Sequence, residues 1–209
     1  MTLHIIVPCK SLAEGKSRLS PILAPRARKI VCARFLANTL EVALSLVPAD
    51  RCHVVVGDKD ADSIVGASGA AIIADPGLGL NVALGAARDR ICHDSAEGLA
   101  MLVLPIDLPF ADNEALSAFI GGKADVVIAP DRQGSGTNAL LIRERALRRF
   151  AFHFGPESFV RHHESATTAG FAVAVHQDPR LSFDVDDPSD YSEWQHGVGT
   201  SQLRTAVST

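Results

Sequence analysis

The sequence predicts an α/β fold, a three-layer sandwich in which helices cover both faces of a mostly parallel sheet. Short apolar, β-branched runs alternate along the chain with segments of helical periodicity, which is the pattern of repeated strand–helix units. The run 99–104 is almost wholly apolar, as expected of a central parallel strand buried on both faces. With 209 residues, the chain is long enough to bury such a core within one domain.

The elements follow from local patterns, beginning with a strand at 3–7, where a β-branched run with one histidine is closed by Pro8. A long helix is expected at 26–47, with a stripe formed by Ile30, Ala33, Ala37, Leu40, Leu44 and Val47. Further strands are expected at 52–56, 70–74, 99–104, 125–129, 138–142, 171–175 and 182–186. Further helices are expected in a short segment ending at Val65 and at 82–92, 113–120 and 157–168.

No internal repeat, low-complexity segment or linker interrupts this alternation. Residues 1–197 are therefore expected to form a single domain. Residues 198–209 contain glycine, serine and threonine without periodicity, and a flexible C-terminal tail is expected there.

The composition argues against several classes of protein. A net charge of -4 argues against a general nucleic-acid binder. The four cysteines lie far apart without a C-x-x-C pair, which indicates reduced thiols in a cytoplasmic protein rather than a disulfide framework or a zinc site. No apolar stretch approaches the roughly 18 residues of a membrane span, and no cationic segment precedes the first apolar run. Neither a membrane span nor a secretory signal is expected.

The charges are distributed unevenly along the chain. Residues 1–40 hold seven Lys or Arg and one acid, whereas residues 181–203 hold five acids and no Lys or Arg. If the fold brings the two ends together, cations and carboxylates face a common cleft.

The loop after the first strand is a candidate phosphate site. Lys10, Lys16 and Arg18 lie within nine residues and are opposed only by Glu14. A buried strand that opens into a flexible cationic loop is a common way for an α/β protein to hold phosphates, and a solvated surface turn is the alternative. Gly15-Lys16-Ser17 is not the end of a P-loop, because that motif requires a glycine where Lys10 stands.

Two acidic positions are candidate metal ligands. Asp107 follows the apolar run 99–104, in the zone where open α/β sheets bind ligands, and a carboxylate there suits Mg²⁺; a helix cap or turn is the alternative. In a strand at 182–186, Asp184 and Asp186 would share one face and repel each other unless a cation lay between them. The alternative for this stretch is a capping turn in which Asp187 starts the final helix, and both roles can coexist.

Two further stretches could hold an anion. In 134–138, backbone N–H groups and the Thr137 hydroxyl could cradle one, and 154–158 offers the same chemistry just before a helix. Ordinary hairpin and cap residues are the alternative in both places. His162 and His163 are adjacent on a helix and point away from each other, so solvated or packed histidines are expected rather than a shared metal.

Taken in order, these motifs resemble one family. They are Val7-Pro8-Cys9-Lys10, Gly15-Lys16-Ser17-Arg18-Leu19, Gly79-Leu80-Asn81, Pro105-Ile106-Asp107-Leu108-Pro109, Gly136-Thr137-Asn138, Phe154-Gly155-Pro156-Glu157-Ser158-Phe159 and Asp184-Val185-Asp186-Asp187-Pro188. The set is similar to the guanylyltransferases that activate a phosphorylated three-carbon acid for making the deazaflavin coenzyme F-420. Known members use 2-phospho-L-lactate, phosphoenolpyruvate or 3-phospho-D-glycerate. The resemblance covers roughly residues 3–195, and Cys9 and Gly15 depart from a pattern in which Val and Ala are common.

The resemblance implies the Rossmann-like nucleotidyltransferase fold shared with nucleotide-diphospho-sugar transferases. It implies that the first loop wraps the GTP phosphates, that two carboxylates hold Mg²⁺ and that a third group of residues binds the acceptor acid. The implied residues are Lys16 and Arg18 as the catalytic cations, Pro8, Lys10, Gly79 and Asn81 for the nucleotide, Asp107 and Asp186 for the metal, and Thr137, Gly155 and Ser158 for the acceptor.

In the implied reaction, a phosphate oxygen of the acceptor attacks the α-phosphorus of GTP in line, and pyrophosphate leaves. Because the acceptor phosphate is already anionic, positioning and charge neutralisation carry the catalysis without a strong general base. One alternative is a molybdopterin nucleotidyltransferase, although those enzymes usually have two adjacent glycines where this chain has only Gly15; another is a non-catalytic nucleotide-binding module. The expected partners are GTP, the phosphorylated acid and a downstream enzyme of the F-420 pathway, with no nucleic acid or membrane.

Overall fold

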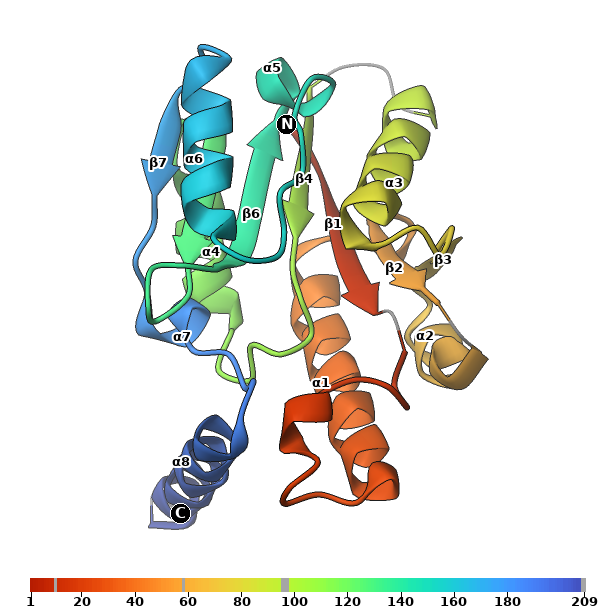
Figure 1. Ribbon diagram of the computed structural model, residues 1–209, viewed down its shortest axis with the longest axis vertical. Helices are drawn as coiled ribbons and strands as arrows, with labels where there is room; N and C mark the ends of the chain where they lie inside the picture. Colours follow the sequence, from red (N-terminus) through yellow and green to blue (C-terminus); the bar gives the residue numbers. More distant parts are fainter. Residues whose placement is uncertain (10, 58, 95–97, 208–209) are drawn as a thin grey trace.

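The computed structural model describes residues 1–9, 11–57, 59–94 and 98–207, which form an α/β sandwich around one sheet (Figure 1). The strands lie in the order β3-β2-β1-β4-β6-β5-β7. Their bounds are β1 Thr2–Cys9, β2 Cys52–Val56, β3 Ala71–Ala74, β4 Leu99–Val103, β5 Val126–Pro130, β6 Thr137–Arg143 and β7 Val173–Val175. Strand β6 is antiparallel to β4 and β5, and the other neighbouring pairs are parallel. The predicted mostly parallel sheet is confirmed.

Helices cover both faces of the sheet and close two apolar cores. Helices α1 (Pro25–Leu46), α2 (Asp62–Ser68) and α4 (Asn113–Gly121) pack into the core on one face, and α3 (Leu80–Asp94), α5 (Glu144–Leu147) and α6 (Ser158–Thr168) into the core on the other. All five residues of β4 are buried between β1 and β6, as predicted for a central strand. The C-terminal ends of β1 and β4 consequently open at the same edge of the sheet.

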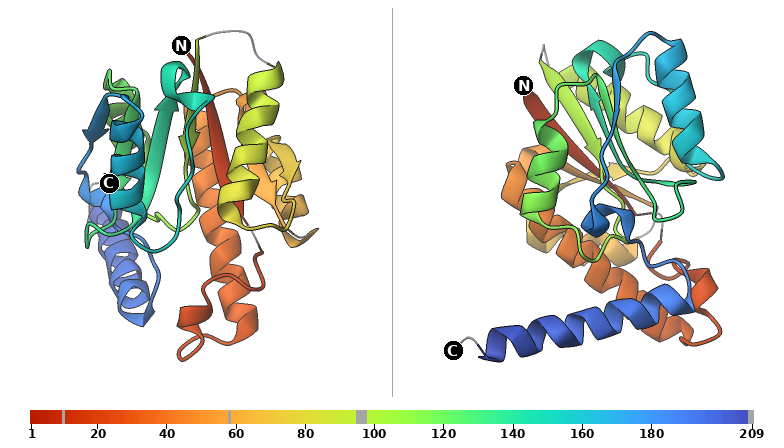
Figure 2. Two further views of the ribbon diagram at one scale, coloured as in Figure 1. Left: turned by 45° about the horizontal axis from the view of Figure 1, so that its top comes forward. Right: turned by 90° about the vertical axis from the view of Figure 1, so that its left-hand side faces the viewer.

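A third apolar cluster joins the two ends of the chain. It consists of Leu19, Val31, Phe35, Phe183, Val185 and Trp194. Leu19 belongs to the 3-10 helix η1 (Ser17–Leu19) after β1, whereas Trp194 belongs to α8 (Pro188–Val207), which begins beside that loop (Figure 2). The rings of Phe35 and Trp194 meet edge to face with their centroids 4.9 Å apart. The third apolar cluster therefore holds the loop after β1 against the segment that leads into α8.

The strand predicted at 182–186 is wrong. Asp178 caps the short helix α7 (Pro179–Ser182) by accepting from the Arg180 N–H (2.8 Å), and residues 183–187 follow without joining the sheet. The N–H of Val185 donates to the Asp107 carbonyl (3.1 Å), which fixes the segment beside the end of β4. Phe183 and Val185 alternate with acidic residues because both pack into the third apolar cluster. The segment cannot pair with β4, since β1 and β6 already flank that strand.

The apolar stripe predicted for α1 is confirmed in part, because Leu40 and Val47 are buried in the core and Ala33 and Leu44 pack against it. Ile30 is 61% exposed, and the buried face instead includes Val31, Phe35 and Leu36. Apolar residues surround much of this helix, so periodicity alone identified only part of the face that packs on the sheet.

The C-terminal segment and the question of a membrane span are two further features to compare with the expectations. Helix α8 continues to Val207, so the backbone is helical over part of the segment 198–209 in which a flexible tail is expected; the flexibility and the single-domain division stay predictions. Among the helices within the described residues, none combines the length and apolarity needed to cross a membrane.

Candidate active site

Lys16 lies between two carboxylates at the edge where β1 and β4 end. Its Nζ is 2.6 Å from Asp107 Oδ2 and 2.8 Å from Asp186 Oδ1, and its side chain is only 9% exposed. Arg18, mostly exposed, approaches the other oxygen of Asp186 (Nη1–Oδ2 3.1 Å). The predicted meeting of the basic N-terminal loop with the acidic C-terminal segment is therefore confirmed as geometry.

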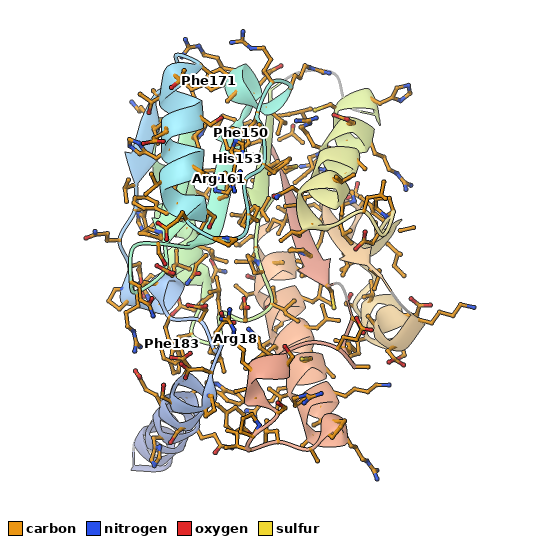
Figure 3. The ribbon with its side chains drawn as sticks, viewed as in Figure 1. Arg18, Phe150, His153, Arg161, Phe171 and Phe183 are labelled. Carbon is orange, nitrogen blue, oxygen red and sulfur yellow. The ribbon has the colours of Figure 1, made fainter. Side chains whose placement is uncertain are left out.

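The sequence produces this arrangement through its apolar neighbours. Leu19 and Val185 are buried in the third apolar cluster, and each carries an adjacent charged residue, Arg18 and Asp186, to its rim. Figure 3 shows Arg18 and Phe183 at the end of the molecule where α8 begins. Lys16 adopts the left-handed conformation (φ 54°, ψ 42°), which turns the chain directly before η1.

The charges at this site are strongly coupled. Burial lowers the pKa of Lys16, but the charges of Asp107 and Asp186 and the hydrogen bonds to them outweigh burial and leave that pKa raised above its ordinary value. Burial, together with the charge of Asp107, raises the pKa of Asp184 to about 6. Asp184 also accepts a hydrogen bond from Asn138 Nδ2 (3.2 Å). Asp184 lines the site and Asn138 holds it in place, and neither residue has a firm role in the sequence-based predictions.

A cavity of about 400 Å³ opens beside Lys16. Its walls include Pro8, Gly15, Lys16, Arg18, Asp107 and Asp186. A second cavity, of about 390 Å³, lies beyond Asp186 and shares Arg18 and Asp186 with the first. Its other walls include Arg132, Ser135 and Asp184. Two adjoining hollows with a shared cationic and anionic rim can hold two anionic molecules next to each other.

The donor set fits a divalent ion of the Mg²⁺ type. Within the ranges that the structure describes, no group of three or more His, Cys, Asp or Glu side chains is already arranged around one point. Asp107 and Asp186 nevertheless each direct one oxygen at a single cation, the Lys16 ammonium. Two carboxylates completed by phosphate oxygens of a substrate are a usual Mg²⁺ site. Lys16 must move away from these oxygens for a metal ion to reach them.

The predicted nucleotide residues are only partly brought together. Pro8 lines the cavity beside Lys16, whereas Lys10 lies outside the described residues. Gly79 (φ 96°) and Asn81 lie at the start of α3 and are not in the described wall of that cavity. The Asn81 amide instead binds both backbone groups of Phe154, donating to its carbonyl (2.9 Å) and accepting from its N–H (2.8 Å).

The segments that carry the three predicted acceptor residues meet at one histidine, His162. Thr137 is buried, with its Oγ1 3.0 Å from His162 Nδ1. Ser158 is also buried and begins α6, and Gly155 (φ 125°) belongs to the segment before it. A solvated or packed histidine is expected at position 162, and His162 is in fact fully buried. Its spacing of four residues from Ser158 is the sequence signal that the two side chains share one face of the helix.

The predicted anion cradle at 134–138 is filled by the chain itself. The Asp131 carboxylate accepts from the N–H groups of Ser135 and Gly136, each at 2.8 Å. A Cβ at Gly136 would lie 2.7 Å from Asp131 Oδ2, so a larger residue there would displace the carboxylate that holds this turn. Phe159 N–H donates to the Ser135 carbonyl (3.0 Å), which ties this turn to the start of α6.

Comparisons with known proteins identify the family of this chain. The family model described as "Guanylyl transferase CofC like" matches residues 3–204. A phosphoenolpyruvate guanylyltransferase of Rubrobacter xylanophilus is 36% identical over 202 residues, covering 95% of this chain and 96% of that protein. A 2-phospho-L-lactate guanylyltransferase of Archaeoglobus fulgidus is 32% identical over 198 residues, covering 94% and 85%.

Solved structures share the fold at low identity. A Desulfovibrio desulfuricans G20 protein that is assigned to the nucleotide-diphospho-sugar transferases has a TM-score of 0.70 at 18% identity, covering 88% of this chain and 82% of that one. The molybdopterin-guanine dinucleotide biosynthesis protein A of Archaeoglobus fulgidus has a TM-score of 0.56 at 16% identity, covering 94% and 99%. These likenesses confirm the predicted fold class.

Proposed function

This chain belongs to the CofC-like guanylyl transferase family and is a nucleotidyltransferase, and we propose that it transfers GMP from GTP to the phosphate of a phosphorylated three-carbon acid. The observation that carries the proposal is the Lys16 ammonium held between Asp107 and Asp186 (2.6 and 2.8 Å) beside a cavity. Cations that can bind phosphates and carboxylates that can bind a metal ion lie together there, as a site for a nucleoside triphosphate requires. The acceptor candidates are phosphoenolpyruvate, 2-phospho-L-lactate and 3-phospho-D-glycerate, the first two of which are named in the activities of the relatives.

In the proposed reaction, an acceptor phosphate oxygen forms a bond to the α-phosphorus of GTP, and the bond between that phosphorus and the bridging oxygen to the β-phosphate breaks. Pyrophosphate leaves with the electron pair. No proton has to be removed from the attacking phosphate, because it is already ionised. The chain's contribution is to bring two polyanions together and offset their repulsion.

Lys16 and Arg18 are the proposed catalytic cations. Lys16 is nearly buried, so its charge acts with little screening by water, and Arg18 lines both cavities. Asp107 and Asp186 would hold Mg²⁺, which when bound supplies further positive charge at the phosphate oxygens. Displaced from the carboxylates, the Lys16 ammonium is free to meet a phosphate instead.

The two substrates are proposed to approach from opposite sides of the charged residues. Pro8 and Lys10 would contact the GTP phosphates, and Gly79 and Asn81 would lie toward the base. Thr137, Gly155 and Ser158 would bind the acceptor acid. Asn81 also holds the backbone of Phe154, next to Gly155, and thereby connects the two proposed subsites.

We further propose that the enzyme acts in the cytoplasm in coenzyme F-420 biosynthesis, where a downstream enzyme consumes its product. The four cysteines, all within the described residues, are buried and not joined in disulfides, which is compatible with a reducing compartment. The molybdopterin alternative has no support beyond a shared fold at 16% identity.

Pyrophosphate release tests the proposal. The purified chain is incubated with GTP, Mg²⁺ and each of the three acids, with reactions lacking acid, or with ATP or CTP replacing GTP, as controls. The expected result is release with GTP and at least one of the acids. GTP binding without pyrophosphate release in the presence of any of the acids would support the non-catalytic alternative. In a further reaction with a molybdopterin acceptor, pyrophosphate release with that acceptor alone would support the molybdopterin alternative.

A further inference from the structure

His162 joins the elements that carry the proposed acceptor residues. Its side chain is fully buried on α6, one helical turn after Ser158. The backbone N–H of His153 donates to His162 Nε2 (2.8 Å), and Nδ1 lies 3.0 Å from Thr137 Oγ1. The ring thus contacts β6 on one side and the segment before α6 on the other. Figure 3 shows His153 and Phe150 beside α6, and both rings lie 5.8 Å from that of His162.

These two contacts determine where the imidazole carries its proton. A backbone N–H only donates, so Nε2 must be unprotonated to accept from His153. Burial, together with the positive charges of His153 and Arg161, lowers the pKa of His162 to about 3, so the ring is neutral near pH 7. A neutral ring with a bare Nε2 carries its hydrogen on Nδ1. His162 therefore donates to the Thr137 hydroxyl.

The direction of this bond decides what Thr137 can do. A hydroxyl has one hydrogen to donate and two lone pairs that accept. Since one lone pair receives the His162 Nδ1–H, the hydroxyl hydrogen is left to donate. In the part of the chain that the structure describes, His162 is the hydrogen-bond partner of the Thr137 side chain. The hydroxyl hydrogen of Thr137 is therefore available to an oxygen of a bound anion.

We propose that His162 is a positioning residue of the acceptor site: its Nδ1–H holds the Thr137 hydroxyl as a donor to the acceptor acid. Its Nε2 holds the backbone at His153, two residues before Gly155, and Asn81 holds the intervening Phe154. One buried ring thereby sets the relative positions of Thr137, Gly155 and Ser158. This role rests on the proposed function, in which those three residues bind the acid.

Two substitutions separate the functions of the two ring nitrogens. In His162→Asn, the side-chain amide lies near the position of Nδ1 and can still donate to Thr137. In His162→Gln, the amide reaches the position of Nε2 and can accept from His153 but leaves Thr137 without its donor. His163→Gln, on the next residue of α6, is the matched control. Thr137→Val removes the hydroxyl and keeps the side-chain shape.

The experiment measures the KM for GTP and for the acceptor acid in each variant. His162→Gln is expected to raise the acceptor KM about tenfold, the effect of one misdirected hydrogen bond to an anion, while the GTP KM stays within about twofold. His162→Asn is expected to retain most of the acceptor affinity, and His163→Gln all of it. Adding His162→Gln to Thr137→Val should raise the acceptor KM no further.

Nitrogen NMR of ¹⁵N-histidine-labelled wild-type protein gives a readout that does not depend on turnover. The expected spectrum shows a protonated Nδ1 and a bare Nε2 for His162. The opposite tautomer, or an active wild type whose acceptor KM is unchanged by His162→Gln, would overturn the positioning role alone. A wild type that releases no pyrophosphate with any acid would overturn the proposed function and the positioning role with it.

Discussion

The ammonium of Lys16 lies 2.8 Å from Asp186 Oδ1, although the two residues are 170 positions apart in the chain. The same nitrogen contacts Asp107, so one buried cation lies between two carboxylates that would otherwise repel each other. Buried charges of this kind are stable only when paired. Lys16 must consequently exchange its carboxylate partners for phosphate oxygens when a polyanion and a divalent ion enter the site.

Removal of the Lys16 charge is expected to separate metal binding from turnover. In Lys16→Met, a divalent ion no longer competes with the ammonium for Asp107 and Asp186. We expect Mn²⁺ to bind several-fold more tightly without nucleotide, while turnover falls on the order of 10³-fold through loss of a preorganised charge. Calorimetry and pyrophosphate release measure the two effects. Unchanged Mn²⁺ affinity, or turnover within tenfold of wild type, would contradict the competition.

The third apolar cluster is expected to support activity from a distance. Phe35→Ala removes the ring that packs on Trp194 and should cost about 3 kcal/mol of unfolding free energy. Because Trp194 is the single tryptophan, its emission should shift to longer wavelength as the start of α8 loosens, and turnover should fall with it. Phe119→Ala, in the core on the sheet, is the control that should destabilise without the emission shift. If the tryptophan emission of Phe35→Ala is not shifted, the third apolar cluster does not hold the start of α8 beside the site.

Space beside the cationic loop is expected to couple Gly15 to Cys32. A Cβ at Gly15 would lie 2.8 Å from Cys32 Sγ and 3.1 Å from the Ser11 carbonyl oxygen. Gly15→Ala should therefore displace the loop that carries Lys16 and reduce turnover severalfold, on the order of 1 kcal/mol in the barrier. Cys32→Ala, added to it, should restore part of the loss. A double variant as slow as Gly15→Ala would assign the effect to the backbone contact instead.

Stability is expected to fall as the solution becomes mildly acidic. The pKa of His162 is lowered to about 3 by burial and the nearby positive charges of His153 and Arg161, whereas the ordinary pKa of a histidine, taken for the unfolded chain, is 6.5. Between these values the unfolded state binds the proton and the folded state does not, so the stability present above pH 6.5 is lost progressively as pH falls toward 3.

The expected loss from this one group between pH 7 and pH 5.5 is about 1 kcal/mol. Urea unfolding at the two pH values measures it. His162→Asn lacks the titrating group, so its stability should fall by less over the same interval. An equal loss in both proteins would show that other groups cause the acid sensitivity.

Much of the fold is predictable because its strands are locally distinctive. The β2 strand Cys52–Val56 and the wholly buried β4 have the composition and length of parallel strands, and the sequence predicts both to within a residue. The segment 183–187 shows the limit of this reasoning. Its alternation of apolar and acidic residues predicts which side chains are buried, but it cannot reveal that no strand is available to pair with it.

The charged part of the site is predictable for a similar reason. Lys16 and Asp107 follow buried strands, and sheet geometry brings such positions to one edge. Asp186 reaches that edge because its neighbour Val185 is buried in the third apolar cluster. The roles of Asn81 and His162 are not predictable, because each depends on hydrogen bonds to a segment 73 or 9 residues away. Those contacts follow from the packing of α3 and α6 on the same face, which local sequence does not report.

The proposed function depends most directly on Asp107 as a site carboxylate. Asp107→Asn keeps the side-chain shape and removes the charge; turnover should fall on the order of 10³-fold, as for loss of a key electrostatic group. Asp62→Asn, on the exposed surface of α2, is the matched control and should be as active as wild type. The measurement is pyrophosphate release from GTP with the preferred acid at saturating Mg²⁺. A fall of the predicted size in Asp107→Asn alone supports the account, and near-normal release in a folded Asp107→Asn protein would contradict it.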